Sequence, residues 1–205
     1  MMNSIDNSWE KYVVDLGLPS GTLWATGNLS KDANENYFIA DYSEYGAYFS
    51  WGNIDGHRVN RQNDSYSFDS STYNSTPGAR IVSSISGNPL YDAARAKLGG
   101  KWRMPTKEEC TELKNYTTFR IGIVNNSRTY FIVTSSVNGN ELYFRFASQY
   151  NGTSIGGNHG QYWTADISDA SNAWKIYLAD NGSEDIFVQT NYRYYGFPIR
   201  PVIRI

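Results

Sequence analysis

The side chains that most often carry bond chemistry are few in this chain and lie far apart. His57 and His159 both occur in polar stretches rich in Gly and Asn, and Cys110 is the single cysteine. A zinc site needs three or four clustered His, Cys or carboxylate ligands, and the sequence has no such cluster at a useful spacing. It also lacks a G-x-S-x-G nucleophile elbow and a glycine-rich phosphate loop. We therefore expect no catalytic residue, no cofactor and no metal.

The carboxylates are scattered along the chain as well. Glu108 and Glu109 open a predicted helix, where negative charge is stabilised by the positive end of the helix dipole. Asp180, Glu184 and Asp185 flank a predicted turn, which could hold calcium or simply be solvated. The other carboxylates that we considered are Asp15, Glu44 and Asp166. None of these groups resembles a pair of catalytic carboxylates, so an enzyme is not expected.

Two segments have the pattern of helices. In residues 106–116, Thr106 and Glu109 have the spacing of a capping box. Cys110 then falls on the inward face, where it is expected to be a buried small hydrophobe rather than a reactive thiol. The second helix is expected over residues 90–98, where apolar residues recur every four positions before a pair of glycines ends the run.

Short runs of alternating apolar residues dominate the rest of the chain and predict strands. We expect strands over residues 12–16, 22–26, 47–51, 120–124, 130–134, 142–146, 162–165, 173–178 and 199–203. Asn138-Gly139 and Asn181-Gly182 lie between such runs, as in hairpin connections. Many antiparallel strands with two short helices and long loops indicate the α+β class.

Length and composition fit one domain over residues 1–205. Aromatic residues make up 16% of the chain, with 17 Tyr and 6 Trp, and the formal net charge is only -2. Because no basic block is present, no nucleic-acid partner is expected. No stretch of eighteen apolar residues occurs, so we expect no membrane insertion.

Two further segments bear on organisation and location. Residues 53–88 form a long polar stretch rich in Ser, Asn, Asp and Tyr, which predicts either mobile surface cover or a binding element. The first residues lack the basic and apolar regions of a secretory signal, so either the chain is used without one or a leader has been removed.

The last third of the chain favours binding by contact. Segments rich in Tyr, Asn and Ser alternate there with large apolar residues, and Tyr and Asn or Ser are the residues that antibody loops use. Apolar anchors are needed to hold such a surface, because truncating a core Trp costs about 3–5 kcal/mol whereas surface changes cost roughly 0.5 or less. The predicted anchors are Trp163, Trp174, Ile176, Leu178, Phe197 and Ile199, with Lys175 and Tyr177 facing outward between them.

Several motifs occur together in a specific order. They are VDLGLPSGTLWA (residues 14–25), YGAYFSWG (45–52), DAAR (92–95), GGKWRMPT (99–106), GQYWT (160–164) and GFPIRPV (196–202). This succession resembles the "Fibrobacter succinogenes major paralogous domain" family, which is abundant in gut Bacteroidetes and their phages. The resemblance covers nearly the whole chain. It implies a C-type-lectin-like fold of the formylglycine-generating-enzyme branch, with a loop-rich face that binds ligands.

Relatives with this fold have three different functions. Formylglycine-generating enzymes use a pair of cysteines, whereas this chain has one, so that oxidoreductase activity is only a remote alternative. Calcium-dependent lectins carry Glu-Pro-Asn or Gln-Pro-Asp with Trp-Asn-Asp, and none of these motifs occurs here. The third group comprises the variable proteins of diversity-generating retroelements, including phage receptor-binding proteins.

The resemblance to variable proteins implies that residues 150–195 form a variable ligand-binding region. The expected contact residues are Tyr150, Asn151, Thr153, Ser154, Asn158, His159, Asp166, Ser168, Asn172, Asn191, Tyr192, Tyr194 and Tyr195. The expected partner is a protein or glycan on a cell surface, and the expected location is a phage virion or a bacterial envelope. A structural or adhesive domain of a bacterial surface protein, without a dedicated site, would have a similar composition and is the alternative.

Overall fold

The computed structural model describes residues 9–58, 68, 82–124, 127–150, 157–180 and 185–205. Several predictions from sequence fall outside these ranges. They concern most of the polar stretch 53–88, the contact residues Asn151, Thr153 and Ser154, the Asn181-Gly182 turn, and Glu184.

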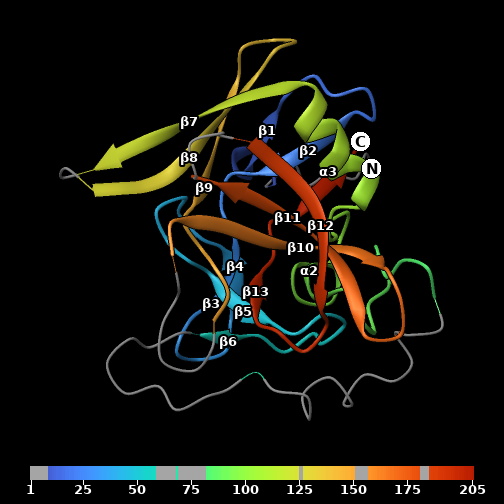
Figure 1. The fold of residues 1–205 in the computed structure, drawn as a ribbon. Helices are drawn as coiled ribbons and strands as arrows, with labels where there is room; N and C mark the ends of the chain where they lie inside the picture. Colours follow the sequence, from blue (N-terminus) through green and yellow to red (C-terminus); the bar gives the residue numbers. More distant parts are fainter. Residues whose placement is uncertain (1–8, 59–67, 69–81, 125–126, 151–156, 181–184) are drawn as a thin grey trace.

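The described residues form an α+β structure, as predicted, in which antiparallel strands outnumber two short helices (Figure 1). The helical elements are η1 (Glu10–Tyr12), α2 (Ala93–Leu98) and α3 (Lys107–Asn115). The early strands are β1 (Val13–Asp15), β2 (Thr22–Ala25), β3 (Leu29–Lys31), β4 (Tyr37–Ile39), β5 (Ala47–Phe49) and β6 (His57–Arg58). The later strands are β7 (Thr117–Val124), β8 (Ser127–Ser135), β9 (Glu141–Arg145), β10 (His159–Ile167), β11 (Asn172–Ala179), β12 (Asp185–Tyr192), β13 (Phe197–Pro198) and β14 (Val202–Arg204).

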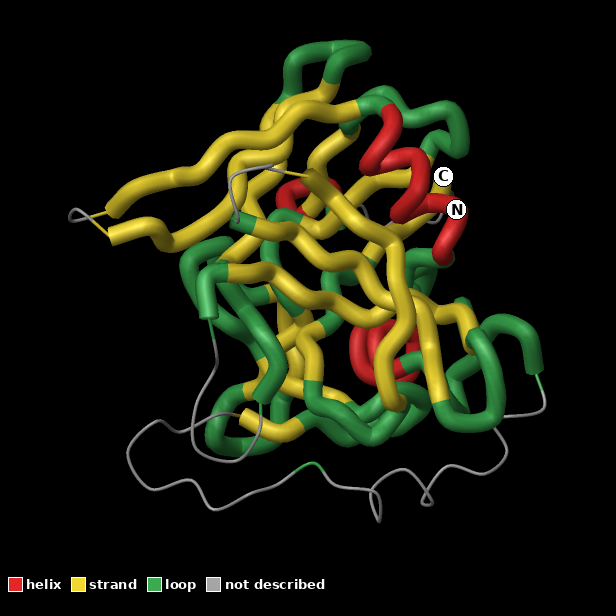
Figure 2. The backbone as a smooth tube through the Cα atoms, viewed as in Figure 1, coloured by secondary structure: helices red, strands yellow, loops and turns green. Residues whose placement is uncertain are grey.

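These strands pair into five small antiparallel sheets. Their orders are β1-β2-β14, β10-β11-β12, β13-β5-β6, β3-β4 and β7-β8-β9. The first sheet brings the two ends of the described chain together, because β1 and β14 both pair with β2. The β7–β8 hairpin projects from the rest of the molecule, as the tube in Figure 2 shows.

The predicted start of α3 and the predicted hairpin are confirmed. The Thr106 side chain accepts from the Glu109 backbone N–H, and the Glu109 side chain accepts from the Thr106 backbone N–H, which completes the capping box. Cys110 is fully buried on α3. The turn at Asn138-Gly139 joins the antiparallel strands β8 and β9, and Gly139 has the positive φ that such turns require. The helix expected over residues 90–98 instead begins at Ala93, because the Asp92 side chain caps it by accepting from the Arg95 N–H, and Leu90 is 68% exposed outside the helix.

Two large hydrophobic clusters hold the sheets together. One contains Trp24, Cys110, Phe144, Ile176 and Leu178, and packs α3 against β2, β9 and β11. The second contains residues of β5, α2, β10 and β13, including Trp163 and Phe197, together with Trp51 from the turn after β5. Two indole N–H groups tie these elements across the second cluster, because Trp163 donates to the Phe49 carbonyl and Trp51 to the Thr164 carbonyl, each at 2.8 Å.

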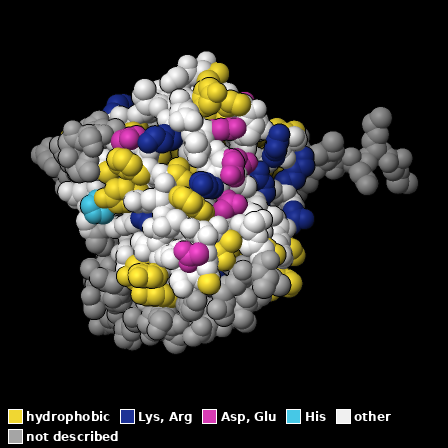
Figure 3. Space-filling model, turned by 45° about the vertical axis from the view of Figure 1, so that its right-hand side comes forward, with side chains coloured by type: hydrophobic (Ala, Val, Ile, Leu, Met, Phe, Trp, Pro, Cys, Tyr) yellow, Lys and Arg dark blue, Asp and Glu magenta, His cyan; other side chains and the backbone are white. Residues whose placement is uncertain are grey.

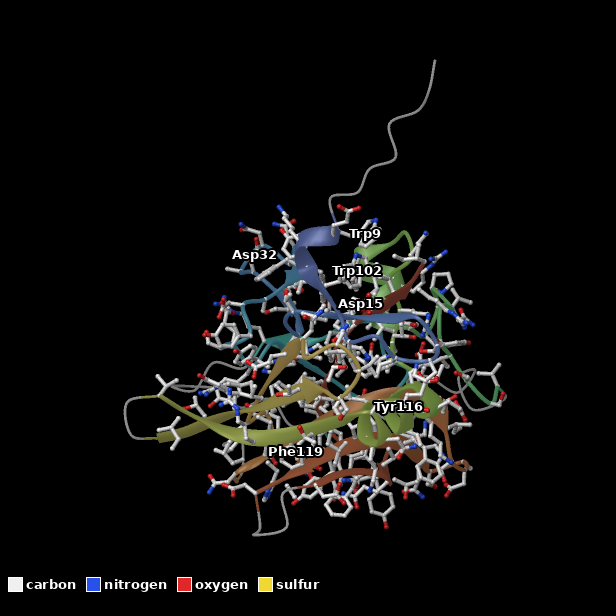
Figure 4. The ribbon with its side chains drawn as sticks, turned by 90° about the horizontal axis from the view of Figure 1, so that it is seen from above. Trp9, Asp15, Asp32, Trp102, Tyr116 and Phe119 are labelled. Atoms are coloured by element: carbon white, nitrogen blue, oxygen red, sulfur yellow. The ribbon has the colours of Figure 1, made fainter. Side chains whose placement is uncertain are left out.

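A smaller cluster covers the outer side of the sheet that contains both chain ends. Leu23 and Ile203 pack there with Trp102, and Trp9 covers them. Trp9 and Trp102 lie near each other in Figure 4, whereas Phe119 belongs to β7 on the other side of the molecule. No helix in the described part of the chain is long and apolar enough to cross a lipid bilayer.

The predicted strand over residues 199–203 is wrong in its boundaries. The chain instead makes β13 with β5, leaves that sheet at Ile199, and pairs with β2 as β14. Arg200 lies between the two strands with its side chain fully buried. The prediction failed because an apolar run that crosses from one sheet to another looks like one buried strand in the sequence.

Five strands were not predicted: β3, β4, β6, β12 and β13. The first three are only two or three residues long, so no periodicity is visible. β12 has eight residues, but Gln189, Thr190 and Asn191 give its second half the composition of a loop. It forms because all eight of its residues pair with β11.

The expected orientation of β11 is only partly correct. Ile176 and Leu178 are buried, as predicted, but Trp174 is half-buried and Lys175, expected to face outward, is only 3% exposed. β11 is the central strand of its sheet, and Trp163 and Phe197 cover the face on which Lys175 lies. A strand covered on both faces does not follow a pattern of alternate burial.

Candidate ligand-binding site

Three tyrosines cluster where β12 ends. Tyr192 closes the strand, and the next turn carries Tyr194 and Tyr195. The rings of Tyr192 and Tyr194 are stacked with centroids 5.5 Å apart, while Tyr195 meets both edge-on at 5.9 and 4.7 Å. Tyr192 is 48% exposed and the other two are half-buried, so the group presents ring surface to solvent. We call these three residues the tyrosine cluster.

Buried residues hold the turn beneath the tyrosine cluster. Arg193 stands between exposed Tyr192 and half-buried Tyr194 and is itself 0% exposed. The backbone carbonyl of Arg193 accepts from the backbone N–H of Trp51 at 2.8 Å, and its backbone N–H donates to the Ser171 carbonyl at 2.9 Å. Its guanidinium lies 4.9 Å from the centroid of the Trp51 ring. Gly196 is equally constrained, since a Cβ there would lie 2.3 Å from the Phe68 ring. The tyrosines are therefore displayed on a fixed backbone.

Polar residues adjoin the tyrosine cluster on the neighbouring strand and turn. Asn172 lies directly opposite Tyr192, and Asn191 lies opposite Ala173. The turn before β11 carries Ser168, which is exposed, and Asp169, whose carboxylate accepts from the Asn172 side chain at 3.0 Å. The Asp169 carboxylate also accepts from the backbone N–H of Ser171. These hydrogen bonds lower the pKa of Asp169, and the one from Ser171 is the largest cause. Sequence reasoning missed Asp169, although an Asp-x-x-Asn spacing is typical of such turns.

The expected contact residues do not form one group. His159 pairs with Ala179, whereas Tyr192 pairs with Asn172, at the other end of the same strand. Eight strand residues span roughly 23 Å, so Asn158 and His159 lie far from the tyrosine cluster. The His159 ring instead lies 5.2 Å from Tyr177, whose ring is 6.2 Å from Phe187. This row of three half-buried rings crosses the sheet from β10 to β12.

Tyr150 does not belong to the exposed surface. It is 1% exposed and its ring packs against Tyr48, His57 and Phe68, with centroids between 5.7 and 6.1 Å away. Its N–H donates to the Gly196 carbonyl at 3.1 Å. Tyr150 therefore supports the turn of the tyrosine cluster from the inside, and its burial does not favour the ligand contact that we expected of it.

Asp166 is also committed within the protein. Its Oδ2 accepts from the backbone N–H of Lys107, the first residue of α3, at 2.5 Å. Burial, the largest cause, raises the pKa of Asp166. The carboxylate thus caps α3 in addition to the Thr106 capping box, and its expected role in ligand contact is not what the geometry favours.

Asp166→Ala is expected to lower the free energy of unfolding by about 1 kcal/mol, as loss of a helix cap does. Glu44→Ala, which removes an exposed carboxylate, is the matched control and should leave stability unchanged. Urea unfolding of both variants measures the difference. Equal stability of the two variants would contradict the capping role.

A buried polar group lies on the sheet face that carries the row of three rings. Lys175 Nζ donates to Gln161 Oε1, and Gln161 Nε2 donates to Ser148 Oγ at 3.0 Å. All three residues are less than a tenth exposed. Burial lowers the pKa of Lys175 to about 8. Sequence reasoning missed this group because Lys on a strand normally indicates the solvated face.

The candidate metal ligands are dispersed in the described residues, and the thiol of Cys110 is buried. Within the described ranges, no three His, Cys, Asp or Glu side chains gather as metal ligands would. Burial raises the pKa of the Cys110 thiol well above its ordinary value, which disfavours the nucleophilic thiolate. Acidic, basic and apolar side chains are interspersed on the face drawn in Figure 3. In comparisons with known proteins, no family model, no curated protein and no solved structure matches this chain.

Proposed function

We propose that this protein is a non-catalytic ligand-binding module that recognises a protein or glycan on a cell surface. The proposal includes a C-type-lectin-like fold and membership of the Fibrobacter succinogenes major paralogous domain family. Paired terminal strands and small antiparallel sheets flanked by two helices support that fold. The motifs that carry the family resemblance support the membership.

The exposed tyrosine cluster is the observation that carries the proposal. Tyr supplies a large contact area with few rotatable bonds, so it loses little entropy on binding. The rings order one another by mutual contact, and buried Arg193 fixes the backbone beneath them. A micromolar complex needs about 8 kcal/mol, and contact residues worth roughly 2 kcal/mol each could supply most of it.

The same turn supports the relation to retroelement variable proteins. Asn191, Tyr192, Tyr194 and Tyr195 are all at least partly exposed, whereas Arg193 among them is fully buried. Substitution of an exposed residue changes the free energy of unfolding little, whereas substitution of a buried cation changes it strongly. A segment built in this way can change its contact chemistry while its backbone stays in place.

Replacing Tyr192, Tyr194 and Tyr195 together by Ala is expected to abolish binding to target cells. The probe is the fluorescently labelled protein on fixed gut Bacteroidetes cells and on a printed glycan array. Because these side chains are exposed or half-buried, the free energy of unfolding should fall by about 2 kcal/mol at most. Binding and urea unfolding are measured on the same preparations.

A second group of three tyrosines provides the control. Tyr42, Tyr130 and Tyr143 lie with ring centroids 5.0 to 5.7 Å apart, and Tyr42 is 40% exposed. Tyr130 and Tyr143 lie on β8 and β9, and Tyr42 lies in the turn after β4. Replacing these three residues by Ala removes the same chemistry from another part of the surface and should leave binding intact. Equal loss in both variants, or no binding of the wild type to either surface, would overturn the proposal.

A structural role within a larger surface assembly is the second candidate. It is favoured by the projecting β7–β8 hairpin, near whose tip Ile123 is 63% and Val124 42% exposed (Figure 2). Exposed apolar side chains of this kind indicate contact with another protein. The double variant Ile123→Asp/Val124→Asp distinguishes the two functions. A structural role predicts that it no longer assembles, whereas the ligand-binding function predicts that it binds its ligand as the wild type does.

A further inference from the structure

Lys175 is a buried cation without a counter-charge. Its side chain is 3% exposed, and Gln161 Oε1 is the only acceptor that its Nζ has among the described residues. No carboxylate in the described ranges forms an ion pair with it. An ammonium group has three N–H donors, so this one retains capacity for further acceptors.

Aromatic rings surround the ammonium group but do not neutralise it. Nζ lies 4.9 Å from the Tyr177 ring centroid and 5.3 Å from that of Phe197. Cation–π contacts of this kind stabilise a charge modestly. A buried charge is ordinarily paired, and its burial here lowers the pKa to about 8, so at neutral pH the charged form persists at an energetic cost.

Lys175 is nearer to solvent on its β12 side, because its neighbour on β10, Trp163, is fully buried whereas its neighbour on β12 is exposed. Lys175 lies directly opposite Gln189 on β12, and residues opposite each other in an antiparallel pair project from the same face. Gln189 is exposed, and Asn191 and Phe187, the next residues on that face of β12, are half-buried. A ligand that lies along β12 therefore approaches the ammonium from the Gln189 side.

We propose that Lys175 is a specificity-determining residue that receives the carboxylate of an acidic sugar bound along the face of β11 and β12. This inference rests on the proposed ligand-binding function. The carboxylate would provide the counter-charge that Lys175 lacks, through a charge-assisted hydrogen bond in a site shielded from water.

The chemistry of the surrounding residues selects a sugar with a single negative charge. The half-buried rings of Tyr177 and Phe187 offer apolar faces for the C–H groups of a pyranose, and the Gln189 and Asn191 amides can hydrogen-bond its hydroxyls. A phosphate or sulfate polymer would require several cations. Lys175 is the only Lys or Arg on the described part of this face of β10, β11 and β12, and Lys114 of α3, whose Nζ lies 5.2 Å from the Phe187 ring centroid, is already paired with Asp185.

The test compares two probes that differ only in the acidic group. Methyl β-D-glucuronide carries a carboxylate where methyl β-D-glucoside carries a hydroxymethyl group. We expect the wild type to bind the glucuronide at least about tenfold more tightly than the glucoside, as measured by calorimetry at pH 7. Equal affinity for the two probes, or binding of neither, would overturn the inference.

Two variants assign the selectivity to the side chain. Lys175→Met keeps the length of the side chain without its charge and should bind both probes equally. Lys101→Met removes an exposed charge elsewhere and should retain the wild-type preference. A Lys175→Met variant that still prefers the glucuronide would refute the role of Lys175.

The cell-binding assay separates this inference from the function on which it rests. If Lys175→Met binds target cells as the wild type does, while the tyrosine-cluster variant does not, the inference fails and the proposed function stands. Selective binding of N-acetyl-aspartate amide over N-acetyl-asparagine amide, with neither sugar bound, would assign the carboxylate to a peptide and overturn the acidic-sugar assignment.

Discussion

Lys175→Met is expected to stabilise the protein at pH 7 by roughly 2 kcal/mol. Burial lowers the pKa of Lys175 from 10.5 to about 8, which corresponds to about 3 kcal/mol of unfavourable free energy for the charged form in the folded state. Met removes this cost and fills a similar volume. Gln161 Oε1 loses its donor, which offsets about 1 kcal/mol of the gain.

The pH dependence of this gain provides the stricter measurement. Between pH 8 and pH 10.5 the unfolded chain keeps the Lys175 proton while the folded protein has released it. The unfolded state then binds more protons, so the wild type gains stability relative to Lys175→Met as pH rises through this range. Urea unfolding of both proteins at pH 7 and pH 9.5 should therefore give a smaller difference at the higher pH.

Lys101→Met is the control, because Lys101 is exposed. It should change stability by about 0.5 kcal/mol or less at either pH. Two results would contradict this prediction: a Lys175→Met variant less stable than the wild type at pH 7, or a stability difference between the two proteins that does not change with pH. Either would show that contacts within the protein offset the whole cost of burying the ammonium group.

Arg200→Lys is expected to lower the free energy of unfolding by about 3–5 kcal/mol. The Arg200 side chain is fully buried, and its Nε donates to Asn28 Oδ1 at 2.8 Å. Its two terminal nitrogens donate to the Ala25 carbonyl at 3.0 Å and the Tyr143 carbonyl at 2.9 Å. The guanidinium thus joins three parts of the chain, and a single ammonium cannot reproduce that planar geometry.

The measurement compares Arg200→Lys with Arg204→Lys. Arg204 is exposed at the end of β14, so the same exchange there should have little effect. Urea unfolding monitored by tryptophan fluorescence gives both values. If the two variants are equally stable, the three hydrogen bonds of Arg200 do not contribute as the structure indicates.

Sequence reasoning succeeded where the signal is local. The capping box depends on Thr106 and Glu109, three residues apart, and the hairpin turn depends on Asn138-Gly139. Both were predicted because short-range hydrogen bonds and backbone preferences determine them. The α+β class followed for the same reason, since it reflects the number and length of the apolar runs.

It failed where distant parts of the chain determine burial. Tyr150 was expected to be a contact residue because the resemblance to variable proteins places it in the binding region 150–195, but its ring is buried against Tyr48 and Phe68. Lys175 looked exposed because the pattern of β11 does not reveal that its second face is covered by Phe197. Arg200 gave no signal either, because its three acceptors are more than fifty residues away in sequence.

The spatial grouping of the expected contact residues followed from the sequence only in part. The exposed tyrosines followed from composition, and the structure brings Tyr192, Tyr194 and Tyr195 into mutual contact. The separation of His159 from them did not follow, because it depends on the register between β10 and β11. Register is determined by the packing of whole strands, which no short motif encodes.

The sheet that joins the two ends of the chain determines how the domain responds to tension. β1 and β14 both run antiparallel to β2, and Val13 and Val202 lie at the same end of it. A pull on the two termini therefore drags β1 and β14 in opposite directions along β2. The hydrogen bonds of each pair then bear the load simultaneously rather than opening one after another. This shear arrangement would resist detachment in flow if the module were held by one end and drawn by the other.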